Sequence, residues 1–400
     1  MRLLLVVVSS AVSAIAQSVL YVDATGVGGA FPTLQAAVAV ATDGDVIRVR
    51  PTGVYDFTTT ITKGLAIVAD STVVSFEGPL QISGVPASQR CVVRGLRPAN
   101  SIGQQFLPAK IRVVGCAGPV SIEEVVLDHT VFPACAGGVG CPALEIVGCA
   151  QVTVDRCTAY GAPALRTSSS HVAVSGSTLQ GQPAVSFWGQ SSSVGLDVVG
   201  GALWLSGTVV RGGNGDPVGG LPGRTAASID GIVRVAGGAL TGGYSTTYEP
   251  AAVVAANQVL TLDSSVALSG AVVGNQAIVD AGRVEFVPAA PGQPFTAGLV
   301  GPAGSIGALA WGLPAPPLPT FFGEMWFDPG AYVVIAIGVL PLAAVSVPLP
   351  AFTVPGELFT LQGLVIDQGQ WRVSHPGRRG GRGRGGARAR VSVRGGAGRA

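Results

Sequence analysis

The chain is dominated by short segments in which apolar residues alternate with small or polar ones. Alternation with a period of two residues, over runs bounded by Gly, Ser and Pro, is typical of β-strands with one buried face. The runs are also too short and too evenly phased for helices. Three of them align as SIEEVVLDHT, VTVDRCTAYG and VAVSGSTLQG, with the apolar pairs Val120/Ile122, Val152/Val154 and Val172/Val174 in the same columns.

A second regularity is the recurrence of Pro-Ala followed by Leu or Val. Copies begin at Pro142, Pro163 and Pro183, at intervals of 21 and 20 residues, and a looser copy begins at Pro250. A fixed short period indicates a solenoid. Because hairpin dipeptides are not repeated at each corner, we expect a coil that winds in one direction and stacks equivalent strands in parallel, about 4.8 Å apart. The pattern predicts a parallel β-helix in which Pro-Ala-Leu marks the start of each rung.

The later rungs, such as GALWLSGTVVRGG and GIVRVAGGALTGG, are less regular, and loops such as NGDPVGGLPGRT and TGGYSTTYEP separate them. Upstream, TLQAAVAVA is a short helical run, DGD is a turn and VIRVR alternates as a strand. This helix-turn-strand resembles the start of the pectate-lyase-like and pectin-methylesterase-like β-helices, in which a helix caps the first rung. The resemblance, and the rule for parallel crossovers, imply a right-handed coil over residues 17–295, with its first edge covered by the helix.

The periodicity ends after residue 295. AYVVIAIGVLPLAAVSVPLPAF carries no charge over 22 residues and could be a membrane span. Its three prolines and its many β-branched residues favour strands, so we expect a small β module over residues 296–376. With GEMWFDP and LQGLVIDQGQWRVSHP, this region resembles a β module at the C-terminus of various secreted bacterial proteins, which implies attachment or display.

Composition agrees with an all-β fold, because 59 of the 400 residues are Gly and only 12% are charged. MRLLLVVVSSAVSAIA has the pattern of a signal peptide, residues 1–16, cleaved after Ala16. An N-terminal membrane anchor is the alternative, but the apolar run is short for one. We therefore expect a secreted or cell-envelope protein.

The charge is divided unevenly along the chain. Residues 377–400 carry eight Arg and no acidic residue, and removing these eight from the 24 basic residues leaves 16 against 22 acidic ones. This Gly/Arg-rich tail is expected to be disordered. Behind a signal peptide it favours polysaccharide, anionic envelope polymers, lipids or acidic proteins as partners rather than nucleic acid. The alternative is a solvated appendage without a partner.

All six cysteines lie between Cys91 and Cys157, which suits an oxidising compartment. Cys116 in VVGCAG and Cys149 in IVGCAQ fall in one column on adjacent rungs, which predicts a disulfide. Cys135 and Cys141 could close the loop inserted between them. Cys91 and Cys157 would lie two rungs apart, about 10 Å, which is too far for a disulfide.

One charged constellation stands out. Arg94, Glu123 and Asp155 are predicted to share an outward column, with Glu124 and Arg156 beside it. Carboxylates on neighbouring rungs could bind calcium, and the candidate ligands are Glu123, Glu124 and Asp128. The pectate-lyase resemblance implies that an arginine could neutralise a uronate or assist proton abstraction. The alternative is a structural ladder of ion pairs, and otherwise we expect no cofactor.

Sequence motifs do not support a defined activity. His129, His171 and His375 form no metal-spaced cluster, and phosphate loops, nucleophile elbows and HExxH are absent. The aspartates and arginine of pectinesterases and the Gly-His-Gly of polygalacturonases are not recognisable either. Sugar binding has candidates in exposed aromatic residues and one arginine: Trp204, Trp188, Tyr244, Tyr248 and Arg156.

These observations predict a non-catalytic extracellular β-helix protein that presents a surface to polysaccharide or to the cell envelope. One alternative is a polysaccharide lyase or related enzyme that acts through Arg94, Glu123 and Asp155. The other is a structural or adhesive surface protein, held by its C-terminal module and basic tail.

Overall fold

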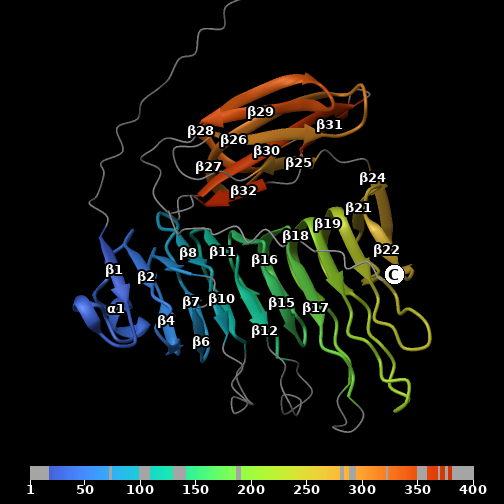
Figure 1. Ribbon diagram of the computed structural model, residues 1–400. Helices are drawn as coiled ribbons and strands as arrows, with labels where there is room; N and C mark the ends of the chain where they lie inside the picture. The colour runs from blue at the N-terminus through green and yellow to red at the C-terminus, as the bar shows by residue number, and fades with distance from the viewer. Residues whose placement is uncertain are drawn as a thin grey trace, which may run out of the picture.

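A computed structural model describes residues 18–71, 74–98, 109–128, 141–185, 191–279, 283–287, 294–320, 323–348, 358–367, 370–373 and 377–380. The described part up to residue 279 is a parallel β-helix, and the rest forms a smaller antiparallel module beside it (Figure 1). The predicted all-β fold is confirmed. The predicted signal peptide lies outside the described residues and stays a prediction.

Each turn of the coil passes through three sheets, which we call sheets A, B and C. Sheet A contains β1 (Val19–Val22), β2 (Val46–Val49), β5 (Ala66–Ala69), β8 (Cys91–Arg94), β11 (Val120–Glu123), β14 (Val152–Asp155), β21 (Leu260–Asp263) and β24 (Gln276–Val279). Sheet B contains β3 (Val54–Asp56), β6 (Ser75–Glu77), β9 (Arg97–Pro98), β12 (Val126–Asp128), β15 (Thr158–Gly161), β17 (Thr178–Gly181) and β22 (Ala267–Ser269).

Sheet C contains β4 (Thr59–Ile61), β7 (Leu80–Ser83), β10 (Ile111–Val114), β13 (Leu144–Val147), β20 (Ala252–Val254) and β23 (Val272–Val273). Three long strands turn the corners without a break: β16 (Leu165–Ser175) joins sheets C and A, while β18 (Leu196–Arg211) and β19 (Ala227–Thr241) run through all three. All these pairings are parallel, because the chain returns to each sheet from the same direction.

The corners of the coil follow the Pro-Ala repeat only in part. Leu144 and Leu165 are register partners, and both enter the core as predicted. Leu165 next pairs with Leu196, so the copy at Pro183 lies in an inserted loop and does not start a rung. An inserted loop shifts the repeated sequence out of its column, and the spacing along the sequence does not show such an insertion.

The N-terminal end of the coil is covered by a helix, as predicted. α1 (Leu34–Val40) begins at Thr33, whose Oγ1 accepts a hydrogen bond from the Ala36 amide at 3.2 Å. Its apolar side packs Leu34 and Ala37 into the core of the coil. A short 3-10 helix, η1 (Val27–Gly29), precedes it.

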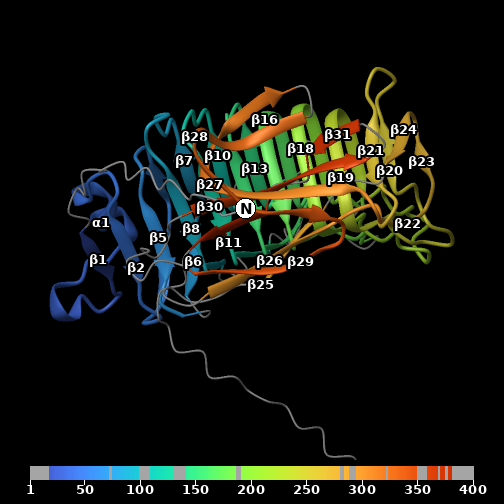
Figure 2. The ribbon, with the colours of Figure 1, turned by 90° about the horizontal axis from the view of Figure 1, so that it is seen from above.

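The C-terminal module is a sandwich of two antiparallel sheets with its own core. One sheet is formed by β25 (Arg283–Val287), β26 (Pro294–Val300) and β29 (Leu342–Pro348); the other by β28 (Gly323–Val339), β27 (Ile306–Thr320), β30 (Leu358–Asp367), β31 (Gln370–Val373) and β32 (Gly377–Gly380). Pairing changes from parallel to antiparallel between Val279 and Arg283, upstream of the boundary expected at residue 295. Figure 2 shows that the module lies directly over the coil.

Two expectations for this region can be compared with the structure. The described part of the uncharged run, residues 331–348, forms the end of β28 and all of β29, and the described residues contain no helix that could cross a membrane. The segment expected to be disordered begins with an ordered strand, because residues 377–380 pair with β30 as β32. The remainder of the tail lies outside the described residues.

Candidate functional site

The predicted charged column exists in the register of sheet A. Glu123 is the partner of Arg94 in β8 and of Asp155 in β14. The alternating residues Ile122 and Val154 face the core, so the three charged side chains point outward, as predicted.

This outward column is nevertheless buried. Glu123 is 2% exposed and Asp155 is 4% exposed, and the outward residues Ser121 and Thr153 beside them are buried too. The C-terminal module lies over this side of the coil (Figures 1 and 2). The sequence interpretation expected an open face here. Because the outward side chains are buried, these carboxylates are not an open surface for a polymer.

The buried charges form a connected network. Glu124 Oε2 accepts hydrogen bonds from Nε and Nη2 of Arg94, both at 3.2 Å, and its Oε1 accepts one from Arg156 Nη2 at 3.1 Å. Arg156 Nη1 lies 2.6 Å from Asp155 Oδ2. Glu124 therefore bridges the two arginines, and Arg156, predicted to bind substrate, is engaged by two carboxylates.

Two hydroxyl groups complete the network. Ser121 Oγ donates to Glu123 Oε1 at 2.9 Å, and Ser175 Oγ donates to Asp155 Oδ1 at 2.7 Å. Glu123 Oε2 is buried without a hydrogen-bond partner. Burial raises the pKa of Glu123 and of Asp155, against the lowering effect of Arg94 and Arg156 respectively.

The backbone beside this column is strained. Glu124 has a φ of 53° and Arg156 a φ of 49°, both left-handed. Their column continues with Gly95 and Gly176, which adopt the same conformation without a Cβ penalty. A non-glycine residue in this region costs about 1–2 kcal/mol. The ion pairs of Glu124 and Arg156 act against that cost.

The predicted calcium ligands are not brought together. Asp128 ends β12 in sheet B, where its charge acts on Lys110 and Tyr160. In the described part of the chain no group of three or more His, Cys, Asp or Glu side chains could hold a metal ion.

The cysteines are placed as the register predicts, but the predicted Cys116–Cys149 disulfide is not formed. Both are free and buried, as are Cys91 and Cys157. A hydrogen bond from the Cys149 thiol lowers the pKa of Cys116 to about 7, and the same contact together with burial raises the pKa of Cys149. The predicted Cys135–Cys141 pairing cannot be described, because Cys135 lies outside the described residues.

The aromatic candidates behave differently from one another. Trp204 points out of sheet A as predicted, but it is only 4% exposed and packs with Ala173 and Ala202. Tyr244 and Tyr248 are exposed on an inserted loop, with their rings edge to face at 5.3 Å. Trp188 lies outside the described residues. Among the described aromatic candidates, the tyrosine pair is open to a ligand.

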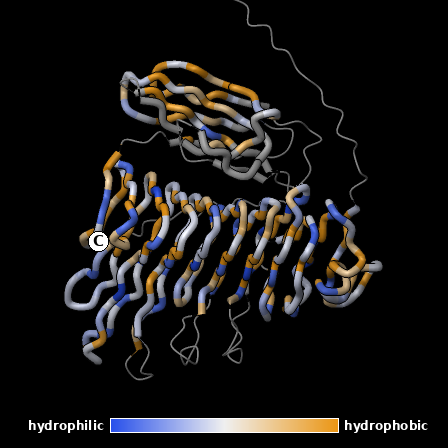
Figure 3. Tube along the Cα trace, turned by 180° about the vertical axis from the view of Figure 1, so that it is seen from behind, coloured by the Kyte–Doolittle hydropathy of each residue, from blue (hydrophilic) through white to orange (hydrophobic). Residues whose placement is uncertain are grey.

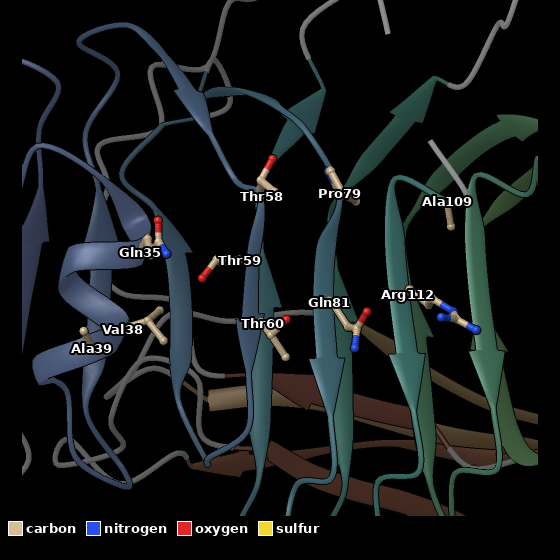
Figure 4. A pocket seen from close by; sticks show the side chains of 10 residues that line it. All are labelled: Gln35, Val38, Ala39, Thr58, Thr59, Thr60, Pro79, Gln81, Ala109 and Arg112. Atoms are coloured by element: carbon tan, nitrogen blue, oxygen red, sulfur yellow. The ribbon is translucent and has the colours of Figure 1, made fainter. Parts of the chain in front are cut away.

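A groove that the sequence analysis did not identify lies on the outer face of sheet C, beside α1. It has a volume of about 550 Å³ and is lined by Gln35, Thr58, Thr60, Gln81, Ala109 and Arg112, among others. Figure 4 shows these side chains between the helix and strands β4, β7 and β10. Hydroxyl, amide and guanidinium groups on the strands, beside apolar side chains of α1, can orient a polar ligand by hydrogen bonds.

The groove opens onto a ladder of alternating charges along sheet C. From Arg112 the outward column runs through Glu145 and Arg166 to Asp197. Arg112 Nε donates to Glu145 at 2.7 Å, and Arg166 Nε donates to Asp197 at 3.0 Å. This column is partly exposed, unlike the charged column of sheet A. Its sequence signal is the alternation in IRVV, LEIV, LRTS and LDVV.

The fold and this site define a parallel β-helix protein with a polar groove at its capped end. The chain matches no protein-family model and no curated protein. Among solved structures it is similar to the enzymatically active domain of tailspike protein 2 of bacteriophage CBA120, at 10% identity and a TM-score of 0.23, over 86% of this chain and 68% of that one. A likeness of this size assigns neither family nor activity, and the pectate-lyase-like resemblance stays a prediction.

Proposed function

We propose that this protein is a non-catalytic, extracellular or cell-surface polysaccharide-binding protein that holds its ligand on the outer face of sheet C. The observation that carries the proposal is the groove between α1 and strands β4, β7 and β10, with hydroxyl, amide and guanidinium groups at its wall. Sugars present many hydroxyl groups, which such side chains can hydrogen-bond without taking part in chemistry.

The shape of sheet C suits a chain rather than a single small molecule. Eight strands from β4 to β20 follow one another on this face, which spans about 34 Å at about 4.8 Å per strand. The loop carrying Tyr244 and Tyr248 connects β19 to β20, at the far end of this sheet. Exposed tyrosine rings there offer apolar faces for a second contact with a sugar ring.

The test is binding of the purified chain to a panel of acidic and neutral polysaccharides, with and without calcium, followed by calorimetry on any ligand found. Arg112→Ala and Gln81→Ala are expected to weaken binding about tenfold each, since each removes a hydrogen bond to the ligand. Arg48→Ala is the matched control, because Arg48 is also a half-buried arginine in an ion pair, with Asp70 at 2.9 Å, but lies in sheet A. Equal affinities for all three variants would refute the groove as the binding site.

A second candidate function is a polysaccharide lyase or related enzyme, which the buried carboxylates and strained backbone around Glu124 favour. It requires the substrate to reach carboxylates that are buried in this structure. The same polysaccharide samples would then contain unsaturated or reducing-end products, and Glu123→Gln and Asp155→Asn would abolish them in a folded protein. Binding without products supports the non-catalytic function.

A further inference from the structure

The outer face of the second sheet of the C-terminal module is apolar. Cross-strand partners in β27 and β28 are Ile306–Val339, Ala308–Ile337, Ala310–Val334 and Gly312–Tyr332, and the register shift after Leu309 keeps all four pairs on one side. The opposite side, with Leu309, Leu361 and Val365, packs into the core of the module. We call the four-pair side the apolar face.

The apolar face is open to solvent. Its exposed part is the β28 side and the start of β27: Ile337 is 73% exposed and Val339 is 64% exposed, and Ile306, Tyr332 and Val334 are exposed as well. The other members on β27 are less open, because Ala308 and Ala310 are partly buried and Gly312 is buried. Figure 3 shows the long hydrophobic stretches in these strands. The outward side of an antiparallel sheet is normally polar, so a contiguous apolar surface of this kind indicates an interaction site.

The C-terminal segment of the chain, residues 377–400, is strongly basic. β30 pairs with β27 on one side and with β32 on the other, and the register places Arg378 opposite Thr360, which is itself opposite Gly312. Eight Arg and no acidic residue occupy residues 377–400. The 20 residues after β32 could reach at most about 70 Å, so the tail can act at the same surface as the apolar face.

We propose that the apolar face and the basic tail together dock the protein on an anionic lipid bilayer. Stable attachment to a membrane surface generally takes two signals, here apolar side chains that enter the interface and arginines that bind anionic headgroups. A second copy of the chain fits less well, because joining two apolar faces would bring two tails of the same charge together. An acidic polysaccharide would satisfy the tail but leave the apolar face uncovered.

The test is co-sedimentation of the full chain with vesicles of phosphatidylcholine alone and with vesicles containing 30% phosphatidylglycerol. The chain is expected to bind the anionic vesicles more tightly, and increasingly so at low salt. Ile337→Thr/Val339→Thr is expected to weaken that binding about tenfold, because it removes apolar area from the interface. The matched control is Val273→Thr/Ile278→Thr, a pair of comparably exposed β-branched residues on the last rung of the coil, with no expected effect.

The tail is tested separately by changing Arg382, Arg384, Arg388 and Arg390 to Gln, which is expected to weaken binding at least about tenfold and to flatten its salt dependence. Circular dichroism and thermal melting confirm that the variants fold. The proposal is overturned if anionic vesicles are not bound, or if the face variant binds like the control. It is also overturned if the chain is a dimer that Ile337→Thr/Val339→Thr converts to a monomer, which would assign the face to a second copy. None of these outcomes depends on polysaccharide binding.

Discussion

Glu123 and Asp155 are register partners on β11 and β14, and both side chains point out of the coil while remaining buried. Asp155 and Glu124 form ion pairs with Arg156, and Glu124 forms one with Arg94. Glu123 forms no ion pair of its own with the described residues but lies within the electrostatic influence of both arginines. With three carboxylates and two guanidinium groups, the network is balanced when one carboxylate holds a proton. Glu123 Oε2, which has no hydrogen-bond partner, is the atom best suited to hold it.

The first prediction concerns the pH dependence of stability. Because burial raises the pKa of Glu123 in the folded state above its usual 4.5, the stabilising contribution of the protonated group is complete below pH 4.5. This contribution is lost as the pH rises through the raised pKa that Glu123 has in the folded protein. Glu123→Gln is expected to remove this loss, so its free energy of unfolding should exceed that of the wild type at neutral pH, the difference growing by up to about 1.4 kcal/mol per pH unit in the titration window.

Urea unfolding over a series of pH values measures this difference. Glu124→Gln is the control, and the opposite effect is expected for it. It breaks the ion pairs with Arg94 and Arg156, so it should lower the free energy of unfolding at neutral pH. If the curves of wild type and Glu123→Gln stay parallel from pH 4 to pH 8, the raised pKa is contradicted.

A second prediction concerns Asp45, whose pKa is lowered in the folded protein, whereas that of Glu123 is raised. Asp45 accepts hydrogen bonds from the Ser18 amide at 2.9 Å and from the Thr42 amide at 2.7 Å. Burial acts to raise its pKa, but these hydrogen bonds outweigh it and the pKa is lowered. The stabilisation is present above pH 3.8, the usual value, and is lost as the pH falls through the lowered folded pKa.

Asp45→Ala should therefore cost about 2 kcal/mol at neutral pH and less in acid. Chemical denaturation at pH 7 and pH 3 gives both values. A cost that does not shrink in acid would show that packing, not the ionised carboxylate, makes the contribution.

A third prediction concerns a strained corner. Ser169 has a φ of 47° and lies in a column with Gly148 and Gly200, which have φ values of 62° and 70°. Ser169→Gly is expected to raise the free energy of unfolding by about 0.5 kcal/mol, because relief of the left-handed strain exceeds the entropy cost of glycine. Ser168→Gly, one residue earlier in regular strand, should lower it by about 0.5–1 kcal/mol. Thermal melting of the two variants should give shifts of opposite sign, and shifts of the same sign would contradict the interpretation.

The fourth prediction separates a structural aromatic residue from an accessible one. Trp204→Ala should cost about 3–5 kcal/mol, because the buried ring leaves a cavity against Ala173 and Ala202. Tyr248→Ala should change stability by no more than about 0.5 kcal/mol, since its ring is exposed. Denaturant unfolding measures both. A Trp204→Ala protein of normal stability that no longer bound polysaccharide would show that Trp204 contacts the ligand directly.

The sequence predicted the coil because its signals are local. Alternation at Val152 and Val154 sets which residues face the core, and stacking in parallel then aligns Arg94, Glu123 and Asp155 without further information. The cap was predictable for the same reason, since Thr33 and the apolar residues after it are a helix start in themselves.

The sequence predictions that failed concern features that depend on contacts between distant segments. Nothing near Glu123 or Trp204 in the sequence shows that their outward-pointing side chains are buried. The groove likewise needs α1 beside three strands that lie 20 to 80 residues later in the chain. The prediction that a rung starts at Pro183 was wrong because an inserted loop can contain the same short sequence as a corner, and the next rung starts at Leu196.

The two ends of the coil are unlike: α1 covers the first turn, whereas β24 pairs only with β21 among the described strands and exposes Ile278. A stack joined mainly by neighbour-to-neighbour pairing can come apart turn by turn. Its weakest turn is the one with a single neighbour, so unravelling starts at β24 and travels toward the helix. A pulling force or a processive protease acting from the C-terminus would first have to unfold the C-terminal module. It would then meet a series of small barriers, and each pause would leave a shorter coil that still ends in its cap.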